Sequence, residues 1–250
     1  MQLHEWTEDP ATAVSLQKAL AARVVRSDQL PSSVSLIAGV DVGFEPQDPT
    51  RNARVDPQAP SVTRAVIVVV EYPSLRLVES VLHRQPTSMA YIPGLLSFRE
   101  LPAILNAYEY LSHRPELVMV DGQGIAHPRR MGVASHLGLW LDVPTIGVGK
   151  RRLCGRHEEV PNVKGAAVAL IDKGDTVGCV LRTREGVKPL YISAGHRISL
   201  DTAREWVMAC LTRYKLPEPT RQADRLASRR TPEGVLMREG RSPQNGAQQR

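Results

Sequence analysis

Cysteine is scarce in this chain, and long apolar runs are absent. The three cysteines, Cys154, Cys179 and Cys210, form no Cys-x-x-Cys pair, which argues against a disulfide framework or a thiolate zinc site. No run of about 18 apolar residues occurs, so we expect no membrane-spanning helix. The first residues lack a basic start followed by an apolar stretch, so no secretory signal is indicated. We therefore expect a cytoplasmic protein that does not bind membranes.

The composition is that of a globular protein with a basic surface. The chain has 250 residues, of which 42% are hydrophobic, 4% aromatic and 23% charged, which is enough to bury one sizeable core. Its net charge of +6 is compatible with a polyanionic partner, because clustered Lys and Arg displace counterions from phosphates.

Two nucleotide-binding motifs are incomplete. Residues 122–127 lack the last glycine of Gly-x-Gly-x-x-Gly, and residues 147–150 lack the first Walker glycine and a following Ser or Thr. These gaps disfavour a nucleotide-dependent α/β enzyme.

Apolar patterns of alternating type predict an α/β fold with parallel strand pairs. Strands are expected at 35–44, 64–72, 75–83, 117–120, 144–149 and 189–193, helices at 98–111 and 131–141, and a hairpin at 165–182. Ser199 should cap a further helix that has Asp201 in its first turn. Residues 1–228 should form a single domain with a polar insert loop at 45–62. Residues 229–250 should form a disordered basic and polar tail.

Three acidic residues stand where the apolar pattern predicts something else. Asp41 lies inside the first strand, Asp121 at the carboxyl end of a buried strand, and Glu100 at the start of a helix. A lone buried carboxylate costs several kcal/mol unless it is paired or bound to metal. Turns at strand ends are the alternative for the two aspartates, and a capping box formed with Ser97 is the alternative for Glu100.

The meaning of these acids depends on whether they converge. At about 4 Å and an effective dielectric constant of about 20, each pair would repel by roughly 4 kcal/mol, so the cluster would have to bind protons or cations. Hard oxygen ligands without a thiolate select Mg²⁺ or Mn²⁺. Such a centre beside basic residues suits phosphodiester hydrolysis. If the carboxylates do not assemble, a non-catalytic binder of damaged nucleic acid is the alternative.

Six blocks of the sequence carry a resemblance to one nuclease family. They are Gly39-Val-Asp41, Tyr91-Ile-Pro-Gly-Leu-Leu-Ser-Phe-Arg-Glu100, Asp121-Gly-Gln-Gly-Ile-Ala-His-Pro-Arg129, Gly147-Val-Gly-Lys150, Gly195-His-Arg-Ile-Ser199 and Glu218-Pro-Thr-Arg-Gln-Ala-Asp224. Together they resemble endonuclease V, the deoxyinosine-directed DNA repair nuclease. The resemblance implies a ribonuclease H-like fold, with a mixed five-stranded central sheet flanked by helices on both faces. It also implies nicking of DNA at the second phosphodiester bond 3′ to hypoxanthine, using Mg²⁺ and leaving 3′-hydroxyl and 5′-phosphate ends.

The resemblance further implies a role for each motif residue. The metal ligands would be Asp41, Glu100 and Asp121, with Asp224 at a fourth catalytic position and Lys150 near the scissile phosphate. Tyr91, Ile92 and Pro93 would form a wedge that fills the gap left by the rotated base. The base pocket would comprise Gly94, Leu96, Gly122, Gly124, His127 and Gly132, whose exposed backbone amides would bond hypoxanthine but not an adenine amino group. Arg129 and Lys150 would contact phosphates.

Simpler interpretations remain for some of these residues. Tyr91 can be a turn or core tyrosine and His127 a loop histidine. The basic residues Arg129, Arg130, Lys150, Arg151 and Arg152 can form a solvated surface. Ala90 and Gly149 depart from the residues usual in the family. Inosine-containing RNA and branched DNA are alternative substrates, and we expect a monomer.

Overall fold

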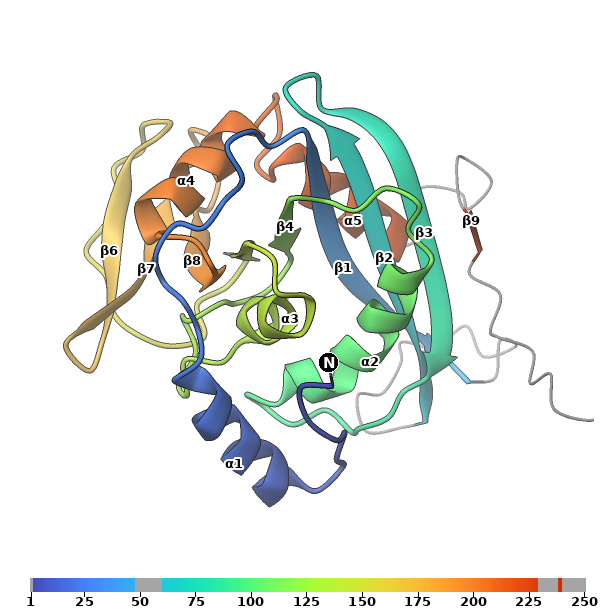
Figure 1. Cartoon of the computed structure of the whole chain (residues 1–250). Coiled ribbons are helices and arrows are strands. Elements are labelled where there is room, and N and C mark those ends of the chain that lie inside the picture. Colours follow the sequence, from blue (N-terminus) through green and yellow to red (C-terminus); the bar gives the residue numbers. More distant parts are fainter. Residues whose placement is uncertain (1, 48–59, 229–237, 240–250) are drawn as a thin grey trace, which may run out of the picture.

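Helices cover both faces of one large mixed sheet (Figure 1). The computed structural model describes residues 2–47, 60–228 and 238–239. Within these residues the helices are α1 (Pro10–Ala21), α2 (Leu96–Glu109), α3 (Val133–Leu141), α4 (Leu200–Ala209) and α5 (Glu218–Ala227). The strands are β1 (Leu36–Pro46), β2 (Ser61–Glu71), β3 (Arg76–Pro86), β4 (Leu117–Val120), β5 (Thr145–Gly149), β6 (Ala167–Asp172), β7 (Asp175–Leu181), β8 (Leu190–His196) and β9 (Arg238–Glu239).

The strands form one sheet in the order β6-β7-β8-β5-β4-β1-β2-β3-β9. β4 is parallel to both β1 and β5, whereas β2 is antiparallel to both β1 and β3. The predicted mixed sheet with helices on both faces is confirmed, but five was the wrong number of strands. The predicted β6–β7 hairpin is present, and β8 pairs with both β7 and β5. Without β8, the backbone of β5 would form an open sheet edge that could pair with another chain.

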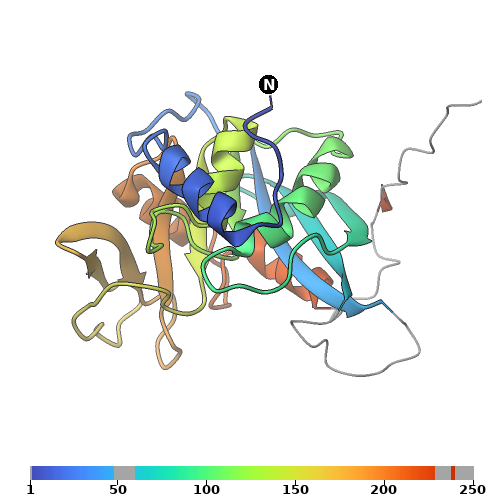
Figure 2. The ribbon, with the colours of Figure 1, turned by 90° about the horizontal axis from the view of Figure 1, so that it is seen from below.

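Strand β1 contributes to a core on each face of the sheet, because successive strand residues point to opposite faces. Ala38 and Val40 pack in the core formed with α2 and α3, and Ile37 packs in the core formed with α4 and α5. In Figure 2, α2 and α3 lie on one side of β1 and β2, and α5 lies on the other. Asp41 shares the face of Ile37 and therefore points toward α5.

The ends of the predicted insert loop were wrong. β1 continues through Glu45 and Pro46, which pair with Val62 and Ser61 of β2. The polar composition of these residues led to the prediction of a loop. In the structure, the Glu45 carboxylate forms an ion pair with Arg84 of β3 at 3.3 Å, so a charged residue is accommodated within the strand. Residues 48–59 lie outside the described residues, as do residues 229–237 and 240–250 of the predicted tail.

Two helices were not predicted, although their start signals are present. Asp9 caps α1 by accepting a hydrogen bond from the Thr12 amide at 2.7 Å, and proline stands in the first turn of both α1 and α5. The α1 segment has weak apolar periodicity. The α5 segment is polar overall, although its few apolar residues gather on one face, and the prediction overlooked them. The predicted cap of α4 is confirmed, since the Ser199 hydroxyl accepts from the Thr202 amide at 3.2 Å.

Candidate active site

Helix α5 lies directly against β1 at two glycines that flank Asp41. A Cβ atom on Gly39 would stand 2.1 Å from the carbonyl carbon of Pro219, and one on Gly43 would stand 2.3 Å from the Ala227 oxygen. Any side chain at these positions would push the helix away. Residues 39, 41 and 43 share one face of the strand, so this close contact carries α5 across Asp41.

The contact brings Asp224 of α5 to Asp41 and Asp121. Each of these three aspartates offers a carboxylate oxygen, and the three oxygens lie within 4.8 Å of one another. Asp121 directly follows β4, and its amide donates a hydrogen bond to the Val40 carbonyl at 2.9 Å. Side chains from three distant parts of the sequence therefore meet beyond the carboxyl end of β4, where α/β proteins commonly bind ligands.

Glu100 belongs to the same charge cluster but not to that tight group of oxygens. It lies in the first turns of α2 and is 8% exposed. Burial raises the pKa of Glu100 well above its ordinary value, and the nearby charges of Asp41 and Asp121 raise it further. The capping-box alternative is wrong, because the helix is capped at Leu95 without any side-chain bond.

Lys150 is the cation that neutralises part of this cluster. It follows β5 and forms ion pairs with Asp121 and, at 2.5 Å, with Asp224. Burial alone would lower the pKa of Lys150, but these two carboxylates raise it above its ordinary value. The pKa of Asp41 is nevertheless held well above its usual range, by burial first and then by the charge of Asp121.

The mutual repulsion of the carboxylates favours binding of a divalent cation. Two unit charges 4.8 Å apart repel by roughly 3.5 kcal/mol at an effective dielectric constant of about 20. One lysine leaves a negative excess among four carboxylates in a largely buried place. All the donors are hard oxygens, and no thiol is among them, which suits Mg²⁺ or Mn²⁺.

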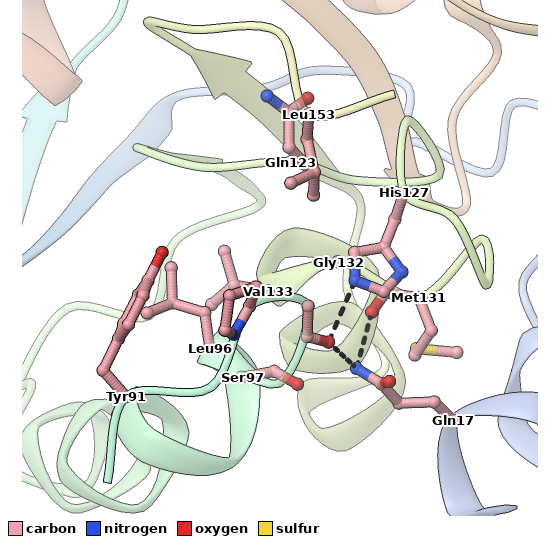
Figure 3. Close-up of a pocket in the computed structure, with 12 residues that line it drawn as sticks. Gln17, Tyr91, Leu96, Ser97, Gln123, His127, Met131, Gly132, Val133 and Leu153 are labelled. Carbon is pink, nitrogen blue, oxygen red and sulfur yellow. Dashed lines mark hydrogen bonds between the residues drawn. The ribbon is translucent and has the colours of Figure 1, made fainter. Parts of the chain in front are cut away.

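A pocket of about 480 Å³ opens beside α2 and α3 (Figure 3). Gly94, Leu96, His127 and Gly132 line it, as do Tyr91 and Pro93 of the predicted wedge. Gly122 and Gly124, which were also predicted to line the pocket, are not among its lining residues. Gly124 instead allows close packing on β8, since a Cβ there would stand 2.1 Å from the Ala194 oxygen.

The other lining residues were not predicted as pocket residues. They are Gln17, Ser97, Gln123, Met131, Val133 and Leu153. Gln17 comes from α1, and its side-chain amide donates to the carbonyls of Gly94 at 3.0 Å and Met131 at 3.2 Å. This single side chain therefore ties two walls of the pocket together (Figure 3).

His127 is held neutral in one tautomer. Its Nδ1 accepts a hydrogen bond from the Arg129 amide at 3.1 Å, so Nε2 carries the proton and donates to the Gly94 carbonyl at 3.0 Å. Burial lowers the pKa of His127 to about 4, and the neighbouring Arg129 charge acts in the same direction. The histidine therefore fixes the loop at Gly94 rather than carrying charge.

The predicted basic residues divide into two groups. Arg129 donates from Nε to Gln17 at 2.6 Å and from Nη2 to the Gly94 carbonyl at 2.7 Å, so its side chain supports the pocket wall. Arg130 pairs with Asp172 of the β6–β7 hairpin at 2.7 Å. Arg151 and Arg152 are exposed. Phosphate contacts by Arg129 and Lys150 stay predictions.

The three residues of the predicted wedge have different environments. Tyr91 is 43% exposed, although it lines the pocket. Pro93 lines the pocket as well, whereas Ile92 packs against a small core with Leu95 and Phe98. The Tyr91 ring is therefore exposed at the pocket while the adjacent Ile92 is anchored in a core, an arrangement compatible with the predicted wedge role.

Comparison with known proteins agrees with this arrangement. The sequence profile of the endonuclease V family matches residues 18–225. The chain belongs to the endonuclease V family. It is 48% identical to endonuclease V of Trichormus variabilis over 229 residues, which is 92% of this chain and 98% of that protein. Endonuclease V proteins are nucleases, and this chain is therefore a nuclease.

Crystal structures of endonuclease V have the same fold. The structure from Streptomyces avermitilis has a TM-score of 0.80 and 37% identity, covering 90% of this chain and 94% of that one. The structure from Ciona intestinalis, with a TM-score of 0.73 and 27% identity, covers 88% of this chain and 95% of that one. The Ciona endonuclease V is bound to a 23mer DNA with an inosine followed by a ribo-adenosine. In the part of our chain that the structure describes, no helix is both long and apolar enough to cross a bilayer.

Proposed function

We propose that this chain is a DNA repair endonuclease that requires Mg²⁺, for which Mn²⁺ can substitute. It nicks DNA at the second phosphodiester bond 3′ to deoxyinosine and leaves 3′-hydroxyl and 5′-phosphate ends. The observation that carries the proposal is the meeting of Asp41, Asp121 and Asp224 within 4.8 Å, beside buried Glu100 and the ion-paired Lys150.

The carboxylate cluster and Lys150 divide the catalytic work. Asp41, Asp121, Asp224 and Glu100 are the residues that would hold the metal, either directly or through water. The bound ion would activate the attacking water and stabilise the departing 3′ oxygen. Lys150 already pairs with two of the carboxylates. With those carboxylates engaged by a metal ion, the ammonium group of Lys150 would be available to bind the scissile phosphate.

The pocket and the wedge select the nucleotide. The pocket combines apolar walls with polar groups from Gln17, Ser97 and His127, a lining that suits a base rotated out of the duplex. Tyr91, exposed at its mouth, would fill the gap left in the stack. The inosine-containing DNA bound by the Ciona relative supports hypoxanthine as the base.

Replacement of Asp121 by alanine tests the catalytic part of the proposal. We expect the nicking rate on an inosine duplex with Mg²⁺ to fall by more than the roughly 10- to 100-fold that loss of an outer metal partner costs. Binding to the same duplex should be retained, because the pocket is intact. Glu158→Gln, an exposed carboxylate outside the cluster, serves as the control. Near wild-type nicking by Asp121→Ala would show that the assigned metal ligand is wrong.

A second substrate is favoured by one observation. In the Ciona complex a ribo-adenosine follows the inosine, so a DNA strand with a ribonucleotide next to the inosine is a second candidate substrate. Side-by-side nicking of inosine-containing DNA, RNA and a DNA strand with one such ribonucleotide, under equal Mg²⁺, would rank them. We expect the DNA duplex to be cut, and failure to cut it with rapid cutting of RNA would reverse the assignment.

A further inference from the structure

The end of the sheet that holds the carboxylates also gathers cations from separate segments. Lys150 follows β5, Arg182 follows β7, and Lys188 stands two positions before β8. Both β5 and β7 run antiparallel to β8, so their carboxyl ends lie beside the start of β8. The three cations therefore lie at one end of the sheet, although they are far apart in sequence.

A fourth cation, Lys215, is anchored at the same end by the connection between α4 and α5. Its backbone carbonyl accepts a hydrogen bond from the Thr183 hydroxyl at 2.7 Å, and Thr183 directly follows Arg182. The next residue, Leu216, packs against the core beneath α4 and α5. These two contacts fix the backbone of Lys215, whose side chain is half-buried.

The charges around Lys215 are mostly of its own sign. Burial lowers the pKa of Lys215, and the charges of Lys150, Lys188 and Arg182 lower it further. The Asp121 carboxylate acts in the opposite direction. Lys215 is thus close enough to the carboxylate cluster to feel its charge, and it is also repelled by its basic neighbours. A further anion at this place would stabilise all of these cations.

Among the residues that the structure describes, Lys188 and Lys215 form no ion pair. The Arg182 guanidinium donates to three backbone carbonyls, which are those of Pro161, Val187 and Val160, at 3.3, 2.5 and 3.0 Å. Those carbonyls hold its position but supply no full negative charge. A phosphate, with its charge and several acceptor oxygens, is the ligand that such a group of cations suits.

The direction of the substrate strand indicates which phosphate this is. The pocket lies on the face of α2 and α3, whereas Lys215 belongs to the face of α4 and α5. In the proposed reaction the inosine occupies the pocket, and the second phosphodiester bond on its 3′ side lies at the carboxylates. The strand would therefore cross the cluster from one face to the other, and its next phosphate would reach Lys215.

We propose that Lys215, with Lys188 beside it, binds the phosphate of the third phosphodiester bond 3′ to inosine, directly beyond the scissile bond. This inference rests on the proposed function and adds a phosphate subsite to it. Every nucleotide carries such a phosphate, so the contact positions the strand and does not select the base. By holding the strand beyond the cut, Lys215 would keep the scissile phosphate against the carboxylates.

A methylphosphonate, in which a methyl group replaces one charged oxygen, tests the contact. Values of kcat/KM for nicking with Mg²⁺ would be compared on an inosine duplex and on the same duplex with a methylphosphonate at the third bond. For the wild-type protein we expect a loss of roughly fivefold to tenfold, between the values of an exposed ion pair and of a hydrogen bond to a charged group. Lys215→Gln should lose a similar factor on the unmodified duplex and should no longer distinguish the two duplexes.

Two further variants separate charge from structure. Lys215→Arg keeps the positive charge and should restore most of the rate and of the discrimination. Arg23→Gln is the matched control, because Arg23 is exposed and its segment bonds to His196 through the Val25 amide. His196 pairs with Thr145 at the start of β5, which is the end remote from Lys150. This control should nick both duplexes as the wild-type protein does.

The salt dependence gives an independent measure of the same contact. Each phosphate contact contributes about 0.7 to 0.9 to the slope of log affinity against log salt concentration. The slope of log kcat/KM against log KCl concentration should therefore be shallower by roughly that amount in Lys215→Gln and unchanged in Lys215→Arg. Thermal melting of each variant would confirm that it is folded, and the wild-type comparison of the two duplexes needs no variant.

The outcomes distinguish this inference from the proposed function. If the wild-type protein does not nick the unmodified inosine duplex, both fail. If it nicks that duplex and the methylphosphonate duplex equally well, the phosphate subsite alone is wrong. If Lys215→Gln keeps the wild-type discrimination, Lys215 is not the group that binds this phosphate. A Lys215→Arg variant as slow as Lys215→Gln would show that the charge of Lys215 is not what matters.

Discussion

Asp41→Asn should stabilise the metal-free protein and abolish most of its stabilisation by metal. The carboxylate oxygens of Asp41, Asp121 and Asp224 lie within 4.8 Å of one another, where each pair of charges repels by roughly 3.5 kcal/mol at an effective dielectric constant of about 20. Lys150 pairs with the other two aspartates and offsets Asp41 least. Asparagine keeps the oxygen that accepts from the Val42 amide at 2.8 Å. We expect the free energy of unfolding in chelator to rise by about 1–3 kcal/mol at mildly alkaline pH.

The gain from Asp41→Asn should depend on pH with a definite sign. Burial and then Asp121 hold the pKa of Asp41 well above its ordinary value, so the folded protein keeps a proton that the unfolded chain has released. The stability of the wild-type protein therefore falls as pH rises from the ordinary carboxyl range through the raised pKa. The variant lacks this contribution, so its advantage should vanish in acid and grow with pH across that window.

Denaturant titrations across pH, in chelator and in Mn²⁺, would measure both effects. Mn²⁺ should stabilise the wild-type protein by binding only the folded state and should stabilise Asp41→Asn far less. Glu158→Gln, an exposed carboxylate, should behave as the wild type in every arm. A variant that is no more stable than the wild type in chelator at alkaline pH would refute the reasoning, as would one that keeps the full Mn²⁺ effect.

Three other substitutions test the packing around the site. Gly39→Ala should lower the free energy of unfolding by about 1–3 kcal/mol and weaken Mn²⁺ binding, because its Cβ would stand 2.1 Å from Pro219. A calorimetric Mn²⁺ affinity equal to that of the wild-type protein would contradict this. Gln17→Ala removes the bonds to Gly94 and Met131, so inosine-duplex affinity should fall, unless the pocket holds its shape without α1. Tyr91→Ala should weaken binding to an inosine duplex but not to an undamaged one in fluorescence anisotropy, and parallel losses would remove the wedge role.

The sequence predicted the centre of the site better than its surroundings. Asp41 and Asp121 interrupt apolar strands, and a buried carboxylate needs a partner, so their convergence follows from the parallel pairing of β1 and β4. Asp224 was linked to them by family resemblance alone, because α5 was not predicted. The contact of Gln17 with the pocket depends on how α1 docks on the fold, and local patterns carry no information about that.

The glycines beside Asp41 show how the fold holds like charges together. Gly39 and Gly43 admit the α5 backbone to within contact distance of β1, while Ala223, Leu226 and Ala227 of the same helix pack into the core. The apolar contacts of α5 therefore oppose the electrostatic repulsion that Asp224 meets at Asp41 and Asp121. Without these apolar contacts, α5 could lower the electrostatic free energy by moving away from Asp41 and Asp121. A cation would relieve the repulsion without moving the helix, so the packing that holds the three carboxylates together also shapes the cluster for a metal ion.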